Sequence, residues 1–534
     1  MKNLSILILF VLVLCASFAG CSKDFLTEHP KDAIYADNLY VNYDGFRLAV
    51  NALLDFPRQE REVVNASTVS LEAGAIWKDG TDIGWANSEL SFSRGLNRYN
   101  VDLNPQAALI TGVFNWLYKV ITASNMIISR AQNSGVDWQG GSPAGDDSLK
   151  NLILAHAHLI RAWAYRHLVY TYGAVPIDTT EINGLTYRND WNRDPVSDVQ
   201  NLIISDLTFA EQYLPDNSND VLVLSRAIAQ HYLADMYLWK GENDKAEEEA
   251  LKVVNNSHYK LVTERYGVKK DQPGCAFMDQ FYSGNILPSQ GNTEGLWVFP
   301  NSDVIDYKGA SGNAMRYTWL VDYSSYAPYS PEYGGRGINR LSVTPWALSI
   351  YEPQDDRGSQ YALRKYYVNT NGDTTYTQSD VAHMVANNKK WESTCKWDWT
   401  YADPSLWNAS YSYSDQTYLR LSDTYLLLAE AEMKLGKLDE AADWINKVRE
   451  RSHASPVTAS QVTLDFILDE RSRELVTEEE RRETLVRTGT LVQRVKAHNP
   501  TAAAGIQDYN VLLPIPQNVI DANTGKVMDQ NPGY

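Results

Sequence analysis

Cysteine and positive charge are both scarce in this sequence of 534 residues. It has four cysteines, and its 48 Lys and Arg residues are outnumbered by 66 Asp and Glu residues, which gives a formal net charge of −18 at pH 7. A nucleic-acid partner requires a basic face that neutralises phosphates, so we expect no nucleic-acid binding. An acidic balance indicates instead solubility and weak affinity for anionic surfaces.

Signatures of catalysis and of metal binding are also missing. The sequence contains no Gly-Lys-Ser/Thr phosphate loop, no His-Glu-x-x-His, no Gly-x-Ser-x-Gly and no Cys-x-x-Cys. His156, His158 and His167 share one predicted helix, but their spacing does not give the i, i+4 pair of a helical metal site. We therefore expect no enzyme activity, no cofactor and no metal.

A charged stretch near the C-terminus could be mistaken for a catalytic site. Glu470, Glu474 and Glu478 alternate there with arginines, and two carboxylates in a cleft can hydrolyse a glycosidic bond. Three or four residues apart on a helix, however, opposite charges usually pair with each other. We interpret the stretch as ion-paired, and a surface carbohydrate-active hydrolase remains the alternative.

The N-terminus has the features of a targeting segment. Lys2 precedes an apolar run, Leu4 to Leu14, that is short for a membrane span and typical of a signal peptide. The run leads to Phe18-Ala19-Gly20-Cys21, which resembles the lipobox of bacterial lipoproteins with Phe18 in place of the usual Leu. We expect residues 1–20 to be removed and Cys21 to be lipidated and to anchor the protein. The alternative is an ordinary signal peptide followed by a chance cysteine.

A helical hairpin occurs twice in the chain. Residues 418–449 predict two helices joined at Gly436, and the same small and apolar residues recur 195 positions earlier around Gly241. This spacing resembles tetratricopeptide repeats, in which small residues let paired helices approach closely. Further helices are expected at 42–54, 114–131, where Trp116 should be buried, and 149–172. The predicted fold class is mainly α, a helical-repeat scaffold at about 40–255 and 415–495.

Long irregular stretches interrupt this scaffold. Residues 63–104 and an insertion at about 258–413 lack helical periodicity and are rich in turn residues and aromatics, which predicts loops and short strands. An aromatic residue in a polar loop is either a plug over the core or a platform for a ligand. We select as candidate ligand-binding residues Trp77, Asp82, Trp85, Asn87, Arg94, Tyr317, Trp319 and Tyr323.

Several stretches resemble the SusD/RagB family of outer-membrane nutrient-binding lipoproteins. They are Ser22 to Leu26 after the lipidated cysteine, Tyr172 to Pro176, Ile467 to Leu475, Leu512 to Gln517 and Gln530 to Tyr534. Glu479, Arg482 and Thr484 depart from the family pattern. The resemblance implies one SusD-like domain over 21–534, anchored in the outer membrane and facing the exterior. It also implies a non-enzymatic binding protein that passes its ligand to a SusC-like TonB-dependent transporter.

The chemistry of the candidate residues suits a sugar ligand. A flat aromatic ring covers the C–H face of a sugar, and short polar side chains bind its hydroxyl rim. Trp319 is the first choice, and the aromatic cluster from Trp391 to Tyr411 is the second. The expected ligand is an oligosaccharide or polysaccharide, and a peptide is the alternative within the family. A disulfide between Cys275 and Cys395 is possible outside the cytoplasm but is not decided by the sequence.

Overall fold

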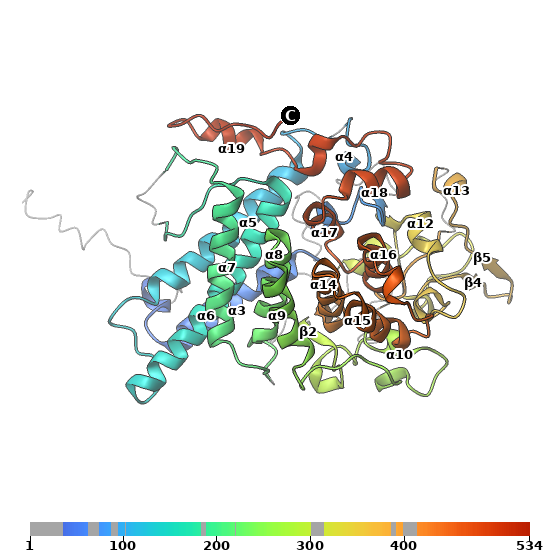
Figure 1. Ribbon diagram of the computed structural model, residues 1–534, viewed down its shortest axis with the longest axis horizontal. Coiled ribbons are helices and arrows are strands. Elements are labelled where there is room, and N and C mark those ends of the chain that lie inside the picture. Colours follow the sequence, from blue (N-terminus) through green and yellow to red (C-terminus); the bar gives the residue numbers. More distant parts are fainter. Residues whose placement is uncertain are drawn as a thin grey trace, which may run out of the picture.

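A computed structural model describes residues 36–61, 74–86, 94–101, 103–182, 188–218, 220–300, 314–385, 391–398 and 414–534. Helices dominate these residues, and the strands among them form three two-stranded antiparallel sheets. Figure 1 shows the N-terminal helices stacked side by side, the C-terminal helices beside them, and irregular segments with short helices and strands on the far side. The mainly α fold class is thus confirmed.

The N-terminal helices pack around one long central helix. This is α6 (Pro143–Tyr172), which starts with Ser142 as its cap and ends at Gly173 with φ of 73°. Its second half is buried on all sides, because α5 (Ala108–Arg130), α7 (Val196–Tyr213) and α3 (Tyr43–Gln59) pack against it. Trp116 on α5 is buried as expected.

Both predicted helical hairpins are present. The first pairs α8 (Arg226–Lys240) with α9 (Asn243–Val254), and the second pairs α14 (Leu421–Lys434) with α15 (Leu438–Arg451). Gly241 and Gly436 turn the chain with φ of 74° and 78°, a left-handed conformation that favours glycine. Helix α14 also packs against α9, so the two hairpins are neighbours in space.

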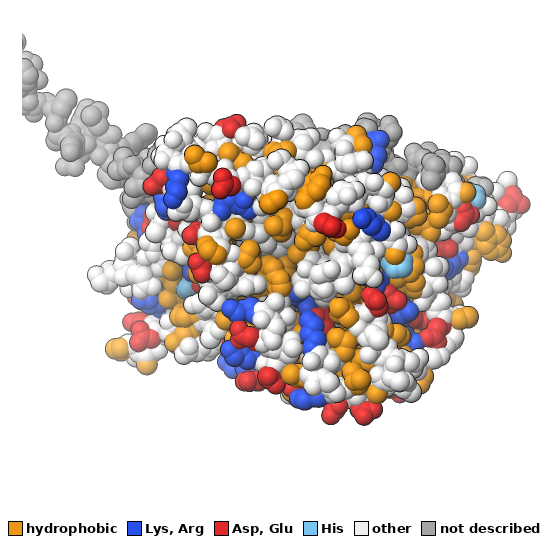
Figure 2. Space-filling model, turned by 45° about the horizontal axis from the view of Figure 1, so that its top comes forward, with side chains coloured by type: hydrophobic (Ala, Val, Ile, Leu, Met, Phe, Trp, Pro, Cys, Tyr) orange, Lys and Arg blue, Asp and Glu red, His pale blue; other side chains and the backbone are white. Residues whose placement is uncertain are grey.

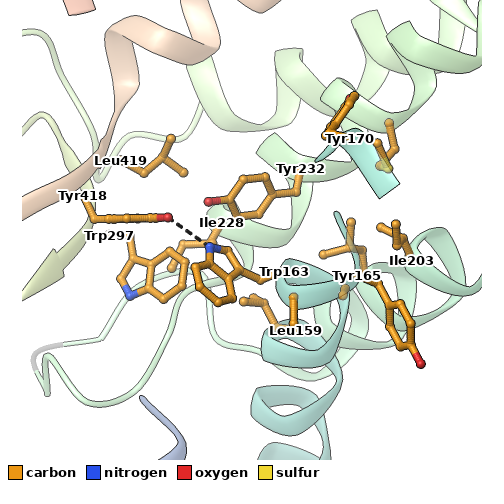
Figure 3. Packing of buried hydrophobic residues seen from close by; sticks show 14 of the residues in the cluster. Leu159, Trp163, Tyr165, Tyr170, Ile203, Ile228, Tyr232, Trp297, Tyr418 and Leu419 are labelled. Carbon is orange, nitrogen blue, oxygen red and sulfur yellow. Dashed lines mark hydrogen bonds between the residues drawn. The ribbon is translucent and has the colours of Figure 1, made fainter. Parts of the chain in front are cut away.

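Aromatic side chains join the hairpins to the N-terminal helices. Trp163 on α6 donates a hydrogen bond from Nε1 to the Tyr418 hydroxyl at 3.0 Å (Figure 3). Trp297 and Tyr232 pack in the same cluster, and their rings come from β2 and α8. The main core therefore continues from the first helices to residues more than 250 positions later.

The C-terminal helices carry the charged stretch into the interior. They are α16 (Leu464–Leu475), α17 (Arg481–Arg487), α18 (Leu491–His498) and α19 (Gln517–Ala522). Glu474 binds Arg357, Arg420 and Arg451, and all four side chains are at most 1% exposed. Ion pairing is confirmed, but most pairs reach to distant parts of the chain, and among the described residues only Arg473 and Glu470 pair within α16.

The remaining elements are short, as the sequence predicted for its irregular stretches. β1 (Gly84–Ala86) pairs with β3 (Leu341–Val343), β2 (Gly295–Phe299) with β6 (Gln416–Arg420), and β4 (Tyr366–Val368) with β5 (Thr374–Tyr376). The short helices are α2 (Ala36–Leu39), α4 (Arg94–Asn97), α10 (Ala276–Asp279), α11 (Met315–Trp319), α12 (Pro345–Ser349) and α13 (Val381–Val385). Turns of 3-10 helix are η3 (Gly267–Lys269), η4 (Pro288–Gln290), η6 (Pro331–Tyr333), η7 (Asp356–Gly358), η9 (Ala459–Gln461) and η10 (Asp508–Val511).

The molecular surface has mixed charge despite the acidic balance. On the face shown in Figure 2, basic and acidic side chains are interspersed and hydrophobic side chains lie scattered between them. None of the helices in the described ranges combines the length and the apolarity that crossing a bilayer requires.

Candidate ligand site

Described residues from three distant parts of the chain lie close together around Arg61. The Arg61 carbonyl accepts a hydrogen bond from the Ala314 amide at 2.8 Å, and its Nη1 donates to the Thr417 carbonyl at 2.8 Å. The Gly74 amide donates to the Glu60 carbonyl at 3.3 Å. Phe299 pairs with Gln416 in the sheet of β2 and β6. We call Arg61, Gly74, Ala314, Gln416 and Thr417 the Arg61 junction.

Arg61 holds this junction together by packing as well as by hydrogen bonds. Its guanidinium lies 4.8 Å from the ring centre of Tyr418 and 5.5 Å from that of Trp397. A cation over an aromatic face is stabilising by about 0.5–2 kcal/mol, more when it is shielded from water. Arg61 is 2% exposed, so it fixes the relative positions of helix α3, strand β6 and the segment around Trp397.

Several buried polar atoms at the junction have unused hydrogen-bonding capacity. Within the described residues, no partner lies within hydrogen-bond distance of Arg61 Nε and Nη2, of the Gln416 amide or of Thr417 Oγ1. A buried polar group without a partner costs about 1–3 kcal/mol. Such groups offer both donors and an acceptor, and polar ligands supply the matching atoms.

A buried acid extends the junction toward the core. Glu60 accepts a hydrogen bond from the Tyr418 hydroxyl at 2.7 Å, and Lys78 Nζ lies 3.7 Å from Glu60 and 3.4 Å from Glu480. Burial raises the pKa of Glu60, and the charge of Glu480 raises that pKa further. Lys78 and Glu60 are buried, and Lys78 interacts with both acids. The cluster therefore holds the segment around Lys78 against the end of α3 beside Arg61.

Sequence models of known families match two parts of the chain. Residues 293–534 match the SusD family, and residues 64–238 match a family described as starch-binding and associating with the outer membrane. Together the two matches cover most of α8, the second hairpin, the C-terminal helices and the junction residues other than Arg61. The chain belongs to the SusD/RagB family.

Relatives of this SusD/RagB protein extend over nearly its whole length. SusD-like protein P2 of Formosa agariphila is 26% identical over 98% of each chain, and the starch-binding protein SusD of Bacteroides thetaiotaomicron is 34% identical over 24% of this chain and 23% of its own. The solved structure of a laminarin-binding SusD-like protein, 20% identical, aligns with a TM-score of 0.69 over 92% of this chain and 99% of that chain. At that identity the structural likeness shows the fold.

Four predicted ligand residues of this SusD/RagB protein lie in its interior. Trp77, Trp85, Trp319 and Tyr323 are at most 4% exposed. The Trp77 indole donates to Thr171 Oγ1 at 3.0 Å, and the Tyr323 hydroxyl donates to the Gly335 carbonyl at 2.8 Å. The expectation that these rings are surface platforms is corrected, since all four side chains are buried in the protein.

Asp82 is also engaged within the protein. Burial alone would raise its pKa, but the charges of Arg481 and Arg494, whose nitrogens lie 2.7 Å from its Oδ2, lower the pKa to about 2. The ionised carboxylate accepts hydrogen bonds from two arginines. These bonds connect the residues just before β1 to the C-terminal helices. Because Asp82 is fully buried and already accepts three hydrogen bonds from these arginines, it is not available to orient a sugar hydroxyl.

The other predicted residues divide into two groups. Tyr317 is half-buried, and the guanidinium groups of Arg336 and Arg340 each lie 5.5 Å from its ring centre. Arg94 is the first residue of α4, and its side chain lies outside the described part. Asn87 and Cys21 also lie outside the described residues.

The second-choice aromatic cluster is described only in part. Trp391 and Trp397 are buried and donate to the Val343 carbonyl and to Thr477 Oγ1, at 3.0 and 2.9 Å. Residues 399–411 of that cluster lie outside the described ranges. Cys275 and Cys395 are buried free thiols, and burial raises the pKa of each to about 12.

The Arg61 junction could not be predicted from the sequence. Arg61 and Gln416 sit at ordinary boundaries between a regular element and an irregular stretch, and neither belongs to a motif. The sequence does indicate that irregular stretches begin near residue 63 and end near residue 413. It does not indicate that the residues at these positions lie close together in the fold. Within the described residues, no group of three or more His, Cys, Asp or Glu side chains is placed to hold a metal ion.

Proposed function

We propose that this SusD/RagB protein is a non-enzymatic surface lipoprotein that binds an oligosaccharide over the Arg61 junction. The observation that carries the proposal is that Arg61, Ala314 and Thr417, from three distant parts of the chain, meet beside buried and incompletely hydrogen-bonded polar groups. Binding sites are commonly built from loops held by a rigid scaffold. The starch-binding and laminarin-binding relatives support a carbohydrate as the ligand.

In this proposal, different parts of the chain form the scaffold and contact the ligand. The helical repeats at about 40–255 and 415–495 form the scaffold of a single SusD-like domain over 21–534, and the insertion at about 258–413 supplies much of the ligand-facing chain. Trp399, Tyr401, Trp407 and Tyr411 remain sequence-based candidates for ring stacking. Arg61 acts as a positioning residue that fixes the ends of the stretches that meet the glycan.

The protein is further proposed to work at the outer membrane with a transporter. Lipid on Cys21 would hold it at the outer face, in keeping with the outer-membrane association in the description of the matching family. There it would pass its ligand to a SusC-like TonB-dependent transporter, so modest affinity suffices because both proteins stay at high local concentration. Co-purification after mild detergent extraction tests the partnership, and recovery of the lipoprotein alone in several detergents would contradict it.

Affinity gel electrophoresis and calorimetry against a panel of starch, laminarin, other glycans and peptides test the binding function. We expect retardation by at least one glycan with no release of shorter products. Arg61→Gln should weaken that binding about tenfold, while Arg47→Gln, on the exposed side of α3, should leave it unchanged. Near-ultraviolet circular dichroism checks that both variants are folded.

Three outcomes would redirect the proposal. Steady release of oligosaccharide products would make the protein a hydrolase. Binding of peptides but of no glycan would change the class of nutrient. Equal affinity of Arg61→Gln and the parent protein would move the site away from the junction.

A further inference from the structure

A second hollow lies against the N-terminal helices. It is a groove of about 910 Å³ between α3, α5, α19 and residues from 176–182 and 188–191. Its walls are largely apolar and include Tyr40, Phe56, Phe114, Tyr118, Trp191 and Val519. Each of these side chains packs against the main core or belongs to it. The groove lies beside the first residues that the structure describes. An exposed apolar surface of this size usually marks a binding site.

The polar atoms of the groove do not suit a sugar. The Asp178 carbonyl accepts hydrogen bonds from Asn125 and Tyr165, and its carboxylate binds Thr180. Arg188 pairs with Asp190 at 2.9 Å and covers the Trp191 ring at 3.9 Å. A hydroxyl-rich ligand would lose its hydrogen bonds to water in this groove and regain few of them.

The chain itself provides a suitable occupant. Leu39 and Tyr40 are part of the groove wall and lie at the start of the described chain. Residues 22–35 come directly before α2, and fourteen residues can span about 50 Å when extended. This segment carries Phe25, Leu26 and Ile34, with Pro30 between them. Proline favours an extended backbone, which fits a long groove.

Charge is compatible with this assignment. The segment has acidic residues at Asp24, Glu28 and Asp32 and basic residues at Lys23 and Lys31, and the groove lining has basic side chains at Lys119 and Arg188 and an acidic one at Asp178. Because the segment and the groove belong to one chain, ordinary apolar contacts are enough to hold them together.

We propose that residues 22–35 of the same chain lie in this groove, with Phe25 and Leu26 buried against α5 and α19. The bound segment would seal the apolar face and fix the distance between Cys21 and the body of the protein. This inference does not depend on which nutrient the protein binds.

Photo-crosslinking tests the proposal directly. The mature full-length chain with Cys21→Ala carries a benzophenone amino acid at position 25, and cross-linked peptides are identified by mass spectrometry. We expect cross-links within one chain to peptides of α3, α5 or α19. The same probe at Leu48, which is 55% exposed on α3 and is not part of the groove lining, should give none to α5 or α19.

Substitution provides an independent readout. Phe25→Ser with Leu26→Ser should raise the fluorescence of the apolar dye ANS at least threefold, while Lys23→Ser with Thr27→Ala should not change it. Cross-links between two chains, cross-links outside the groove, no cross-links, or equal dye binding by both variants would overturn the proposal. Exclusion of the dye by the acylated protein alone would also overturn it, because the lipid would then be the occupant.

Discussion

At the scale of single residues, Trp319 contributes to stability. It belongs to the second core cluster, together with Trp85, Trp391 and Tyr323. Trp319→Ala should lower the free energy of unfolding by about 3–5 kcal/mol, because a large buried ring leaves a cavity that the neighbours fill only in part. Urea denaturation measures this change. Tyr376→Ala, at a side chain that is 69% exposed, should change stability by less than about 0.5 kcal/mol.

Asp82 should make the protein sensitive to acid. Its pKa is lowered to about 2 in the folded state from an ordinary 3.8, so it stabilises the fold above pH 4 and loses that effect as the pH falls toward 2. The shift corresponds to about 2 kcal/mol. Calorimetry between pH 2 and 6 should show that Asp82→Asn melts lower at pH 6 and loses less on acidification. Asp44→Asn, at an exposed carboxylate, should follow the parent protein, and identical pH profiles for Asp82→Asn and the parent would contradict the assignment.

Sequence patterns placed some aromatic residues correctly and others not. Trp116 could be assigned to the core because its helical period is local. Trp85 could not, because its indole binds the Val343 carbonyl at 3.3 Å, a partner 258 positions later. Burial of a tryptophan in an irregular stretch depends on chain segments that are distant in sequence. The residues next to the tryptophan do not predict which segments these are.

At the scale of elements, the two hairpin turns depend on their glycines. Gly436 has φ of 78°, and an added Cβ would meet nothing within 4 Å. Gly436→Ala should therefore lower the free energy of unfolding by about 1 kcal/mol through backbone strain alone. Gly241→Ala should behave alike. Gly135→Ala, in open space and without a left-handed φ, is the control in urea denaturation, and equal stability of all three variants would contradict the argument.

The hairpins and the long helices were predictable because their spacing repeats within a few turns. The Arg61 junction was not, because it is made where elements from three regions of the chain meet. The partners of Glu474 show the same limit. The spacing predicts neighbours three or four positions away, but in the structure Glu474 pairs with Arg357 of η7, Arg420 of β6 and Arg451 of α15.

At the scale of the whole molecule, the position of the protein in the cell is open to test. If Cys21 carries the proposed lipid anchor, Cys21→Ala should leave a folded protein that is released from membranes. Fractionation followed by immunoblotting measures the release. Protease added to intact cells should degrade the parent protein, and complete protection would contradict exposure at the surface.

The ionic cluster around α16 also constrains the order in which the chain can fold. Arg357 donates a hydrogen bond to Glu470, which lies 113 positions later in the chain. Glu294 accepts hydrogen bonds from Arg420 and Arg451, which lie 126 and 157 positions later. A chain that ended before α16 would leave these arginines buried without enough carboxylates, and each uncompensated charge costs about 3–5 kcal/mol. The central region therefore cannot reach its final packing until the last helices have been made, and contacts of such long range close slowly. A nonsense mutation before α16, even though it lies late in the gene, should therefore yield a protein that does not fold and is degraded.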